Sequence, residues 1–98
     1  MAPVFEMVVE AMTAYVYVLK SERDGRYYVG STDHLIRRYY QHAGGHVHTT
    51  ARMLPVKMEG WREFETLAAA RQAERKLKSK KSRAYVDRFL RDAHAAAQ

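Results

Sequence analysis

Three side chains with the chemistry to act on one charged group lie within a single short stretch of the sequence. Tyr28 lies in a run of strand-forming residues, and Arg38 and His42 follow, four residues apart, in an expected helix. Residues at this spacing share a helix face. A guanidinium is always charged and its forked donors suit a phosphate, whereas a phenol, with an ordinary pKa of about 10, acts as a base only if that pKa is lowered. The stretch predicts a cleft where a phenol, a guanidinium and an imidazole meet.

A strand, a glycine turn and a helix are predicted to position these groups. Residues 27–29 favour a strand, and Gly30 with Ser31 ends it, because glycine permits backbone conformations closed to other residues. Thr32 or Asp33 is expected to cap the helix with a side-chain oxygen. At about 100° per residue, the apolar stripe of this helix comprises Leu35, Ile36, Tyr39, Tyr40 and Ala43.

A second strand is predicted just before this one. Residues 14–20 are β-branched and aromatic almost throughout, and Asp24-Gly25 is a hairpin signal. The two strands are therefore expected to be antiparallel neighbours. Because side chains alternate between the faces of a strand, pairing across the hairpin can bring Tyr17 close to Tyr28.

The remaining sequence predicts a third strand and two more helices. Residues 46–53 are expected to form a polar loop, and residues 56–64 a strand in which Gly60 marks an edge or a bulge. Thr66 can cap a helix over 67–79. A last helix follows, with the apolar seam Val86, Phe89, Leu90 and Ala93. The predicted fold class is α/β (α+β), with a small central three-stranded antiparallel sheet flanked by helices.

One carboxylate interrupts the apolar stripe of the helix over 67–79. Glu74 falls among core-facing positions, where a carboxylate costs free energy unless it is paired or binds a cation. Two partners remain open, a metal ion or a buried salt bridge to Arg38 or a nearby lysine. Basic residues crowd the same helix, which predicts either a surface that follows phosphates or a solvated helix face.

The composition indicates a small basic domain without thiol chemistry. The chain has 98 residues, a net charge of +6, a pI of about 9.8 and no cysteine. Such a domain favours polyanions, meaning nucleic acid or an anionic membrane surface. No apolar run reaches the roughly 18 residues of a membrane-spanning helix, and the N-terminus lacks the pattern of a signal peptide. We therefore expect a cytoplasmic protein with no membrane partner.

The predicted organisation is a single domain over residues 13–93. Residues 94–98 are expected to form a fraying C-terminal tail. Residues 1–12 form an N-terminal extension that is unusually apolar for a free tail. It is interpreted either as a simple extension or as a contact that forms a homodimer.

The order of these motifs resembles the GIY-YIG nuclease superfamily, in particular its small single-domain stand-alone bacterial branch. Residues 15–17 read Tyr-Val-Tyr and residues 28–30 read Tyr-Val-Gly. Arg38, His42 and the helix with Glu74 follow in the family's order, so the resemblance covers nearly the whole chain. Tyrosine replaces the first glycine of the name motifs, and valine replaces both isoleucines. No asparagine matches the one that some members carry after the glutamate helix.

This resemblance implies a site in which Glu74 holds one divalent metal ion, Mg²⁺ or Mn²⁺. Arg38 would bind the scissile phosphate and offset the charge of the transition state. Tyr17 or Tyr28 would activate or orient the attacking water. His42 would serve as a proton donor, a hydrogen-bond partner of a tyrosine or a phosphate ligand. The expected substrate-binding residues are Gly30, Ser31, Arg52, Arg71, Arg75 and Lys78.

The function implied is metal-dependent hydrolysis of DNA phosphodiester bonds. Nothing in the sequence resembles a module that reads bases, so we expect low sequence specificity and a preference for branched or damaged DNA, as in DNA repair. One alternative is a nucleic-acid-binding protein on the same fold that is catalytically weak or inactive. Another is a protein-interaction module that uses the apolar residues 1–12.

Overall fold

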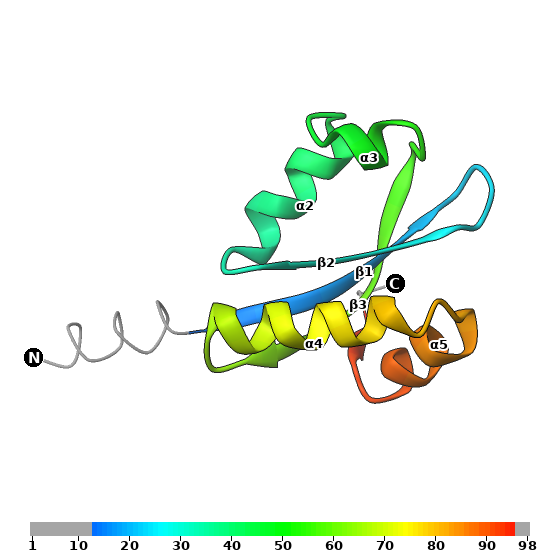
Figure 1. Ribbon diagram of the computed structural model, residues 1–98. Helices are drawn as coiled ribbons and strands as arrows, with labels where there is room; N and C mark the ends of the chain where they lie inside the picture. Colours follow the sequence, from blue (N-terminus) through cyan, green and yellow to red (C-terminus); the bar gives the residue numbers. More distant parts are fainter. Residues whose placement is uncertain (1–12, 96–98) are drawn as a thin grey trace, which may run out of the picture.

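The computed structural model describes residues 13–95 and shows an antiparallel sheet between two layers of helices (Figure 1). The strands are β1 (Ala14–Ser21), β2 (Tyr27–Thr32), β3 (Val56–Phe64) and β4 (His94–Ala95), in the order β2-β1-β3-β4. The α/β fold and its three predicted strands are confirmed. The N-terminal extension over 1–12 and its proposed dimer contact lie outside the described residues.

The fourth strand corrects the prediction that the C-terminal tail frays from residue 94. His94 pairs with Trp61, and Ala95 pairs with Gly60. A two-residue strand has no alternating pattern to detect in the sequence. It makes β3 an inner strand, so Gly60 does not mark an edge. A β-carbon at Gly60 would lie 2.8 Å from the His94 carbonyl oxygen, which explains the glycine. The predicted bulge is present, as the β1–β3 register shifts between Val18 and Leu19.

Helices cover both faces of the sheet. They are α2 (Leu35–Ala43), α3 (His48–Ala51), α4 (Leu67–Ser79) and α5 (Arg83–Arg91). In Figure 1, α2 and α3 lie above the sheet and α4 and α5 below it. Thr66 caps α4 as predicted, since its side chain accepts a hydrogen bond of 3.0 Å from the Ala69 N–H. Within residues 13–95, no helix is both long and apolar enough to cross a membrane.

The alternation of β1 separates two hydrophobic cores. Val16 and Val18 are fully buried against α4 and α5, whereas Tyr17 and Leu19 are buried on the side of α2 and α3. The first core also contains Ala14, Val29, Ala70 and Val86. The second also contains Met53 and Val56. Tyr17 and Ser21 are the buried residues of β1 that carry a hydroxyl, so each hydroxyl needs a hydrogen-bond partner.

Strand β2 is an outer strand of the sheet, and its register with β1 sets the site. Tyr17 lies opposite Gly30, and Leu19 lies opposite Tyr28. Tyr28 therefore shares a face with Tyr17, as predicted. The Asp24-Gly25 turn is also confirmed, with Gly25 at a φ of 78° that glycine adopts without strain.

Helix α2 differs from its prediction at its start and in its buried face. His34 is the N-cap, and its Nδ1 accepts from the Arg37 N–H at 3.3 Å. The predicted caps, Thr32 and Asp33, precede that position. Ile36 and Tyr40 were expected in the apolar stripe, but they are 68% and 67% exposed. The stripe is narrower than predicted because the polar side chain of His42 takes the buried position instead.

The predicted polar loop over 46–53 contains the short helix α3. Its backbone turns so that Thr50 is fully buried beneath α2. A four-residue helix shows no periodic pattern, which is why the sequence did not predict it. Its position matters because it delivers Thr50 to the imidazole of His42.

Candidate active site

The outer edge of β2 is where groups from both helical layers meet. Helix α4 packs against β2 from one face of the sheet, and α2, which follows β2 in the chain, lies over the other face. The predicted residues Tyr17, Tyr28, Arg38 and His42 reach the edge from the α2 side. Glu74 reaches it from α4, where the Ser31 hydroxyl of β2 donates a hydrogen bond to its carboxylate. The chain therefore brings together side chains from four separate elements.

A buried hydrogen-bonded chain runs from Tyr17 through His42 to Thr50. The Tyr17 hydroxyl lies 2.7 Å from Nε2 of His42, and Nδ1 of His42 lies 2.7 Å from Oγ1 of Thr50. The Thr50 hydroxyl donates its own proton to the Val47 carbonyl, at 3.4 Å. Thr50 must then accept from Nδ1–H, which leaves Nε2 free to accept from the Tyr17 hydroxyl. This direction fixes the tautomer of His42.

Burial favours the neutral forms of Tyr17 and His42, the two titratable groups of these hydrogen bonds. Desolvation raises the pKa of Tyr17 to about 12, although hydrogen bonding with Arg38 partly opposes the rise. Desolvation, followed by the charge of Arg38, lowers the pKa of His42 to about 4. His42 is fully buried and neutral near pH 7.

Gly30 makes room for the Tyr17 hydroxyl. A β-carbon at position 30 would lie 2.5 Å from the Tyr17 hydroxyl oxygen, closer than any such contact allows. Gly30 does not end the strand as predicted, because β2 continues to Thr32. It instead permits the phenol to lie against the β2 backbone and to reach His42.

Tyr28 lies beside this chain but on its more open side. Its ring centroid is 6.4 Å from that of Tyr17 and 5.0 Å from that of His42. The Lys78 ammonium lies 5.7 Å from the centroid of the Tyr28 ring. Tyr28 is half-buried, whereas Tyr17 is 1% exposed, so only Tyr28 is open to a ligand without rearrangement.

Glu74 forms the lysine salt bridge that the sequence left open. Nζ of Lys78 lies 2.6 Å from its carboxylate, and the Ser31 hydroxyl binds the other oxygen. The Glu74 side chain is 18% exposed, so its charge is only partly solvated. Arg38 is not its partner but donates to the Gln41 side chain at 3.0 Å.

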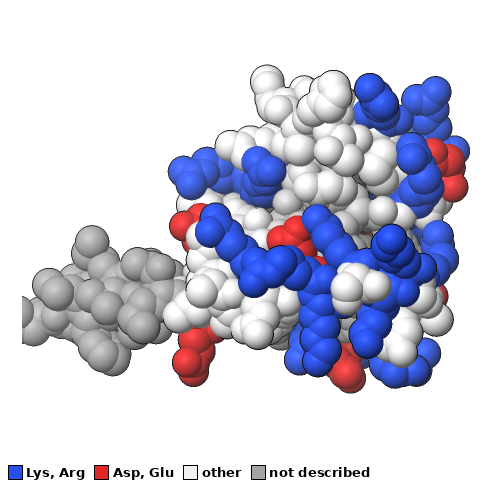
Figure 2. All heavy atoms as spheres, viewed as in Figure 1, with Lys and Arg blue, Asp and Glu red and all other residues white. Residues whose placement is uncertain are grey.

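A basic pocket of about 470 Å³ opens next to these groups. Ser31, Arg38 and Arg71 line it together with Arg37 and Gln41. Its size and three guanidinium groups suit a phosphate group with bound water. Arg37, the neighbour of Arg38 on α2, lines the pocket as well. Lys and Arg side chains gather further along α4 and α5 on the face seen in Figure 2.

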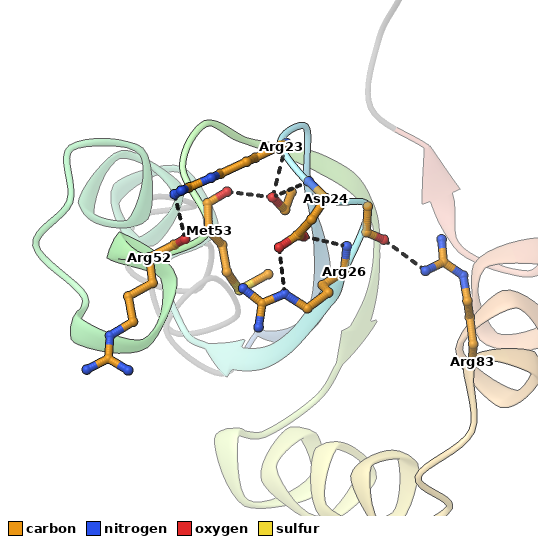
Figure 3. Close-up of polar contacts among 8 residues, drawn as sticks. Arg23, Asp24, Arg26, Arg52, Met53 and Arg83 are labelled. Carbon is orange, nitrogen blue, oxygen red and sulfur yellow. Dashed lines mark hydrogen bonds and ion pairs between the residues drawn. The ribbon is translucent and has the colours of Figure 1, made fainter.

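Of the six predicted substrate-binding residues, only Ser31 and Arg71 line this pocket. Gly30 lies against Tyr17, and Lys78 binds Glu74. Arg52 ends α3 beside the β1–β2 turn, where its carbonyl accepts from the Arg23 guanidinium at 3.4 Å (Figure 3). Arg75 is exposed on α4 and does not line the pocket. Thr50 and Gln41 are polar partners that the sequence analysis missed. Thr50 acts through a tertiary contact with His42, for which the sequence carries no periodic signal. Gln41 contacts Arg38 within α2, at the i,i+3 spacing of a helix.

Two acidic residues lie at the site, Glu74 on α4 and Asp33, which lines the basic pocket. Among residues 13–95, no group of three or more His, Cys, Asp or Glu side chains could hold a metal ion.

A comparison with protein families identifies the class of protein to which the chain belongs. The model of the GIY-YIG catalytic domain matches residues 13–86, so the chain belongs to the GIY-YIG family, whose members are nucleases. Neither the curated proteins nor the solved structures gave a significant match. Nucleases of this family generally use divalent metal ions and act on nucleic acid.

Proposed function

We propose that this protein is a metal-dependent endonuclease that hydrolyses DNA phosphodiester bonds at the edge of β2. The proposal rests on a basic pocket lined by Arg38 and by Ser31, whose hydroxyl donates to the Glu74 carboxylate. The Lys78 ammonium, which binds Glu74 and lies beside the Tyr28 ring, links Tyr28 to the same site. Such a hydrolysis requires an activated water and stabilisation of the negative charge that develops on the phosphate. Each of these tasks has a candidate residue within the site.

Arg38 is assigned to the scissile phosphate. It lines the 470 Å³ pocket, and Gln41 holds its guanidinium at 3.0 Å. A guanidinium that is already oriented loses little freedom on binding and offers paired donors to phosphate oxygens. Arg37 and Arg71, in the same pocket, bind the adjoining phosphate oxygens.

Glu74 suits a single weakly held divalent ion. The Lys78 ammonium, 2.6 Å from the carboxylate, shows that the position beside Glu74 accepts a cation. One carboxylate is enough for Mg²⁺, which keeps several waters and completes its shell with phosphate oxygens. When bound, the ion would polarise the phosphoryl group and lower the pKa of a coordinated water.

Tyr28 rather than Tyr17 is assigned to the attacking water. The Tyr17 hydroxyl donates to His42, and burial raises the pKa of Tyr17 to about 12 and lowers that of His42 to about 4, so the proton stays on Tyr17. Tyr17 and His42 therefore position groups and do not exchange that proton in this state. Tyr28 has a half-buried phenol on the open side of the site, with the Lys78 ammonium 5.7 Å from its ring centroid.

A catalytically weak DNA-binding protein is the second candidate. Both oxygens of Glu74 are already engaged, one by Ser31 and one by Lys78. If the Lys78 ammonium remained in place with DNA bound, the site would bind a phosphate but hold no metal ion. This candidate predicts salt-dependent binding without cleavage.

A cleavage screen separates the two candidates. Flaps, forks, bubbles and duplex DNA are offered with Mg²⁺, with Mn²⁺ and with EDTA. We expect metal-dependent cleavage that Glu74→Gln and Arg38→Ala reduce at least 100-fold, as expected for loss of charge stabilisation. Glu65→Gln and Arg91→Ala, which change exposed residues outside the site, serve as matched controls. Cleavage that survives Glu74→Gln and Arg38→Ala would place the activity elsewhere, and binding without any cleavage would favour the second candidate.

A further inference from the structure

A second pocket, of about 320 Å³, lies between β2 and the turn that joins α4 to α5. Its walls carry the cationic side chains of Arg26, Lys78, Lys81 and Arg83, and no acidic residue lines it. Its floor is apolar and consists of Val29, Leu77 and Val86. A site for a phosphate alone would need the cations but not the floor. The combination suits a ligand with a flat ring and an anionic group.

The Arg83 guanidinium is already ordered at the rim of this pocket. It stacks on Tyr27, 4.0 Å from the ring centroid, and donates to the Gly25 carbonyl at 2.8 Å. Figure 3 shows this side chain reaching from α5 toward the β1–β2 turn. The Tyr27 hydroxyl in turn donates to Asp87 at 2.8 Å. An ordered guanidinium on a tied tyrosine loses little conformational entropy when it binds a phosphate.

The backbone of the α4–α5 turn places Lys81 on the opposite wall. Its φ of 48° is in the left-handed region, the only non-glycine residue of 13–95 with a positive φ. Its N–H bonds to the Lys78 carbonyl at 3.1 Å, which ties the turn to the end of α4. The conformation projects Lys81 into the pocket, whereas the preceding Lys80 lies 5.3 Å from the Tyr85 ring.

Lys78 joins this pocket to the candidate active site. It lines the second pocket while its ammonium binds Glu74 and lies against Tyr28. Arg71, in the first pocket, precedes Lys78 on α4 by about 10 Å at about 1.5 Å per residue. The two pockets are therefore close enough for one strand of nucleic acid to reach both.

We propose that this second pocket takes one unpaired nucleotide of the substrate strand, with its base on the apolar floor and its phosphate between Lys81 and Arg83. The inference rests on the proposed function only in taking nucleic acid as the substrate. A base-paired nucleotide cannot enter, because its base remains stacked in the duplex. The pocket therefore selects DNA with a single-stranded segment, such as a flap or a fork, next to the bond to be cut.

A matched pair of lysine variants tests the pocket. Lys81→Asn removes a pocket cation with a residue that tolerates the left-handed region, and Lys80→Gln removes the same charge from the same turn. Binding to a flap and to a duplex is measured in EDTA, so that no cleavage is required. We expect Lys81→Asn to weaken the flap complex at least fivefold more than the duplex complex, and Lys81→Arg to restore it. Lys80→Gln should weaken both complexes equally.

A fluorescent base in the DNA tests whether one base of the flap enters the second pocket. With 2-aminopurine at successive positions of the flap, we expect one position to brighten on binding, since its base leaves the stack, and Lys81→Asn to abolish that change. Equal effects of the two lysine variants, or no responsive position, would overturn the inference. Thermal melting shows whether Lys81→Asn folds, and Arg83→Gln gives a second test if it does not. A protein that shows both effects but never cleaves would refute the endonuclease and leave this pocket in place.

Discussion

Gly30 lies directly opposite Tyr17 in the β1–β2 pairing, and a β-carbon at position 30 would lie 2.5 Å from the Tyr17 hydroxyl oxygen. Gly30 of the Tyr-Val-Gly motif and Tyr17 of the Tyr-Val-Tyr motif therefore pack directly against each other. The contact lets the phenol reach His42, at 2.7 Å. The two motifs depend on each other because they must fit against each other across the hairpin.

We expect Gly30→Ala to displace the Tyr17 ring and break its hydrogen bond with His42. Overpacking of this kind typically costs about 1–3 kcal/mol. Urea unfolding should show this loss, and cleavage should fall at least tenfold. Gly25→Asn is the control, because Gly25 has open space around it and a positive φ that asparagine tolerates. Unchanged stability and activity in Gly30→Ala would show that the contact does not restrain Tyr17.

Thr50 is expected to fix the tautomer of His42. Thr50→Val keeps the shape but removes the acceptor for Nδ1–H, which leaves a buried donor without a partner and costs about 1–3 kcal/mol. Nitrogen NMR shifts of His42 should show a mixture of tautomers in Thr50→Val and one tautomer in wild type. Thr50→Ser, which keeps the hydroxyl, should resemble wild type. The same single tautomer in Thr50→Val would assign its choice to Tyr17 alone.

The sequence predicted the parts of the site that local rules control. The Asp24-Gly25 turn fixes the hairpin register, and that register places Tyr17 near Tyr28. Glu74 was identified because a carboxylate among core-facing positions needs a partner. Both inferences depend on short-range periodicity, which is the strongest signal in a sequence.

Other parts of the site depend on contacts that no periodicity encodes. Thr50 meets His42 only because α3, a helix of four residues, folds under α2. The predicted buried face of α2 was wrong, since His42 is buried with its partners Tyr17 and Thr50, whereas Ile36 and Tyr40 are exposed. The second pocket draws its walls from β2, α4 and α5, so its residues are neighbours only in the folded chain.

Stability should fall as the pH decreases from about 6.5 toward 4. The pKa of His42 is lowered from 6.5 to about 4 in the folded chain, so the unfolded chain binds the proton more tightly in this range. Protonation therefore favours unfolding, with an effect of up to about 3 kcal/mol. Urea unfolding of wild type and His42→Gln at several pH values measures this difference. His48→Gln, at an exposed histidine, should retain the pH dependence, and a wild type without it would refute the buried neutral imidazole.

Lys78 is expected to compete with a divalent ion for Glu74. Its ammonium lies 2.6 Å from the carboxylate, so an ion that binds there must displace it or share the oxygens. We expect Lys78→Met to tighten the binding of Mn²⁺ by roughly fivefold, which corresponds to a partly exposed ion pair of about 1 kcal/mol. Electron paramagnetic resonance without DNA measures this binding. The same variant should bind flap DNA less tightly, because the second pocket loses a cation. Glu74→Gln should abolish the Mn²⁺ signal in either background. Unchanged Mn²⁺ affinity in Lys78→Met would mean that the ion binds elsewhere, since a cation removed from its own ligand must alter its affinity.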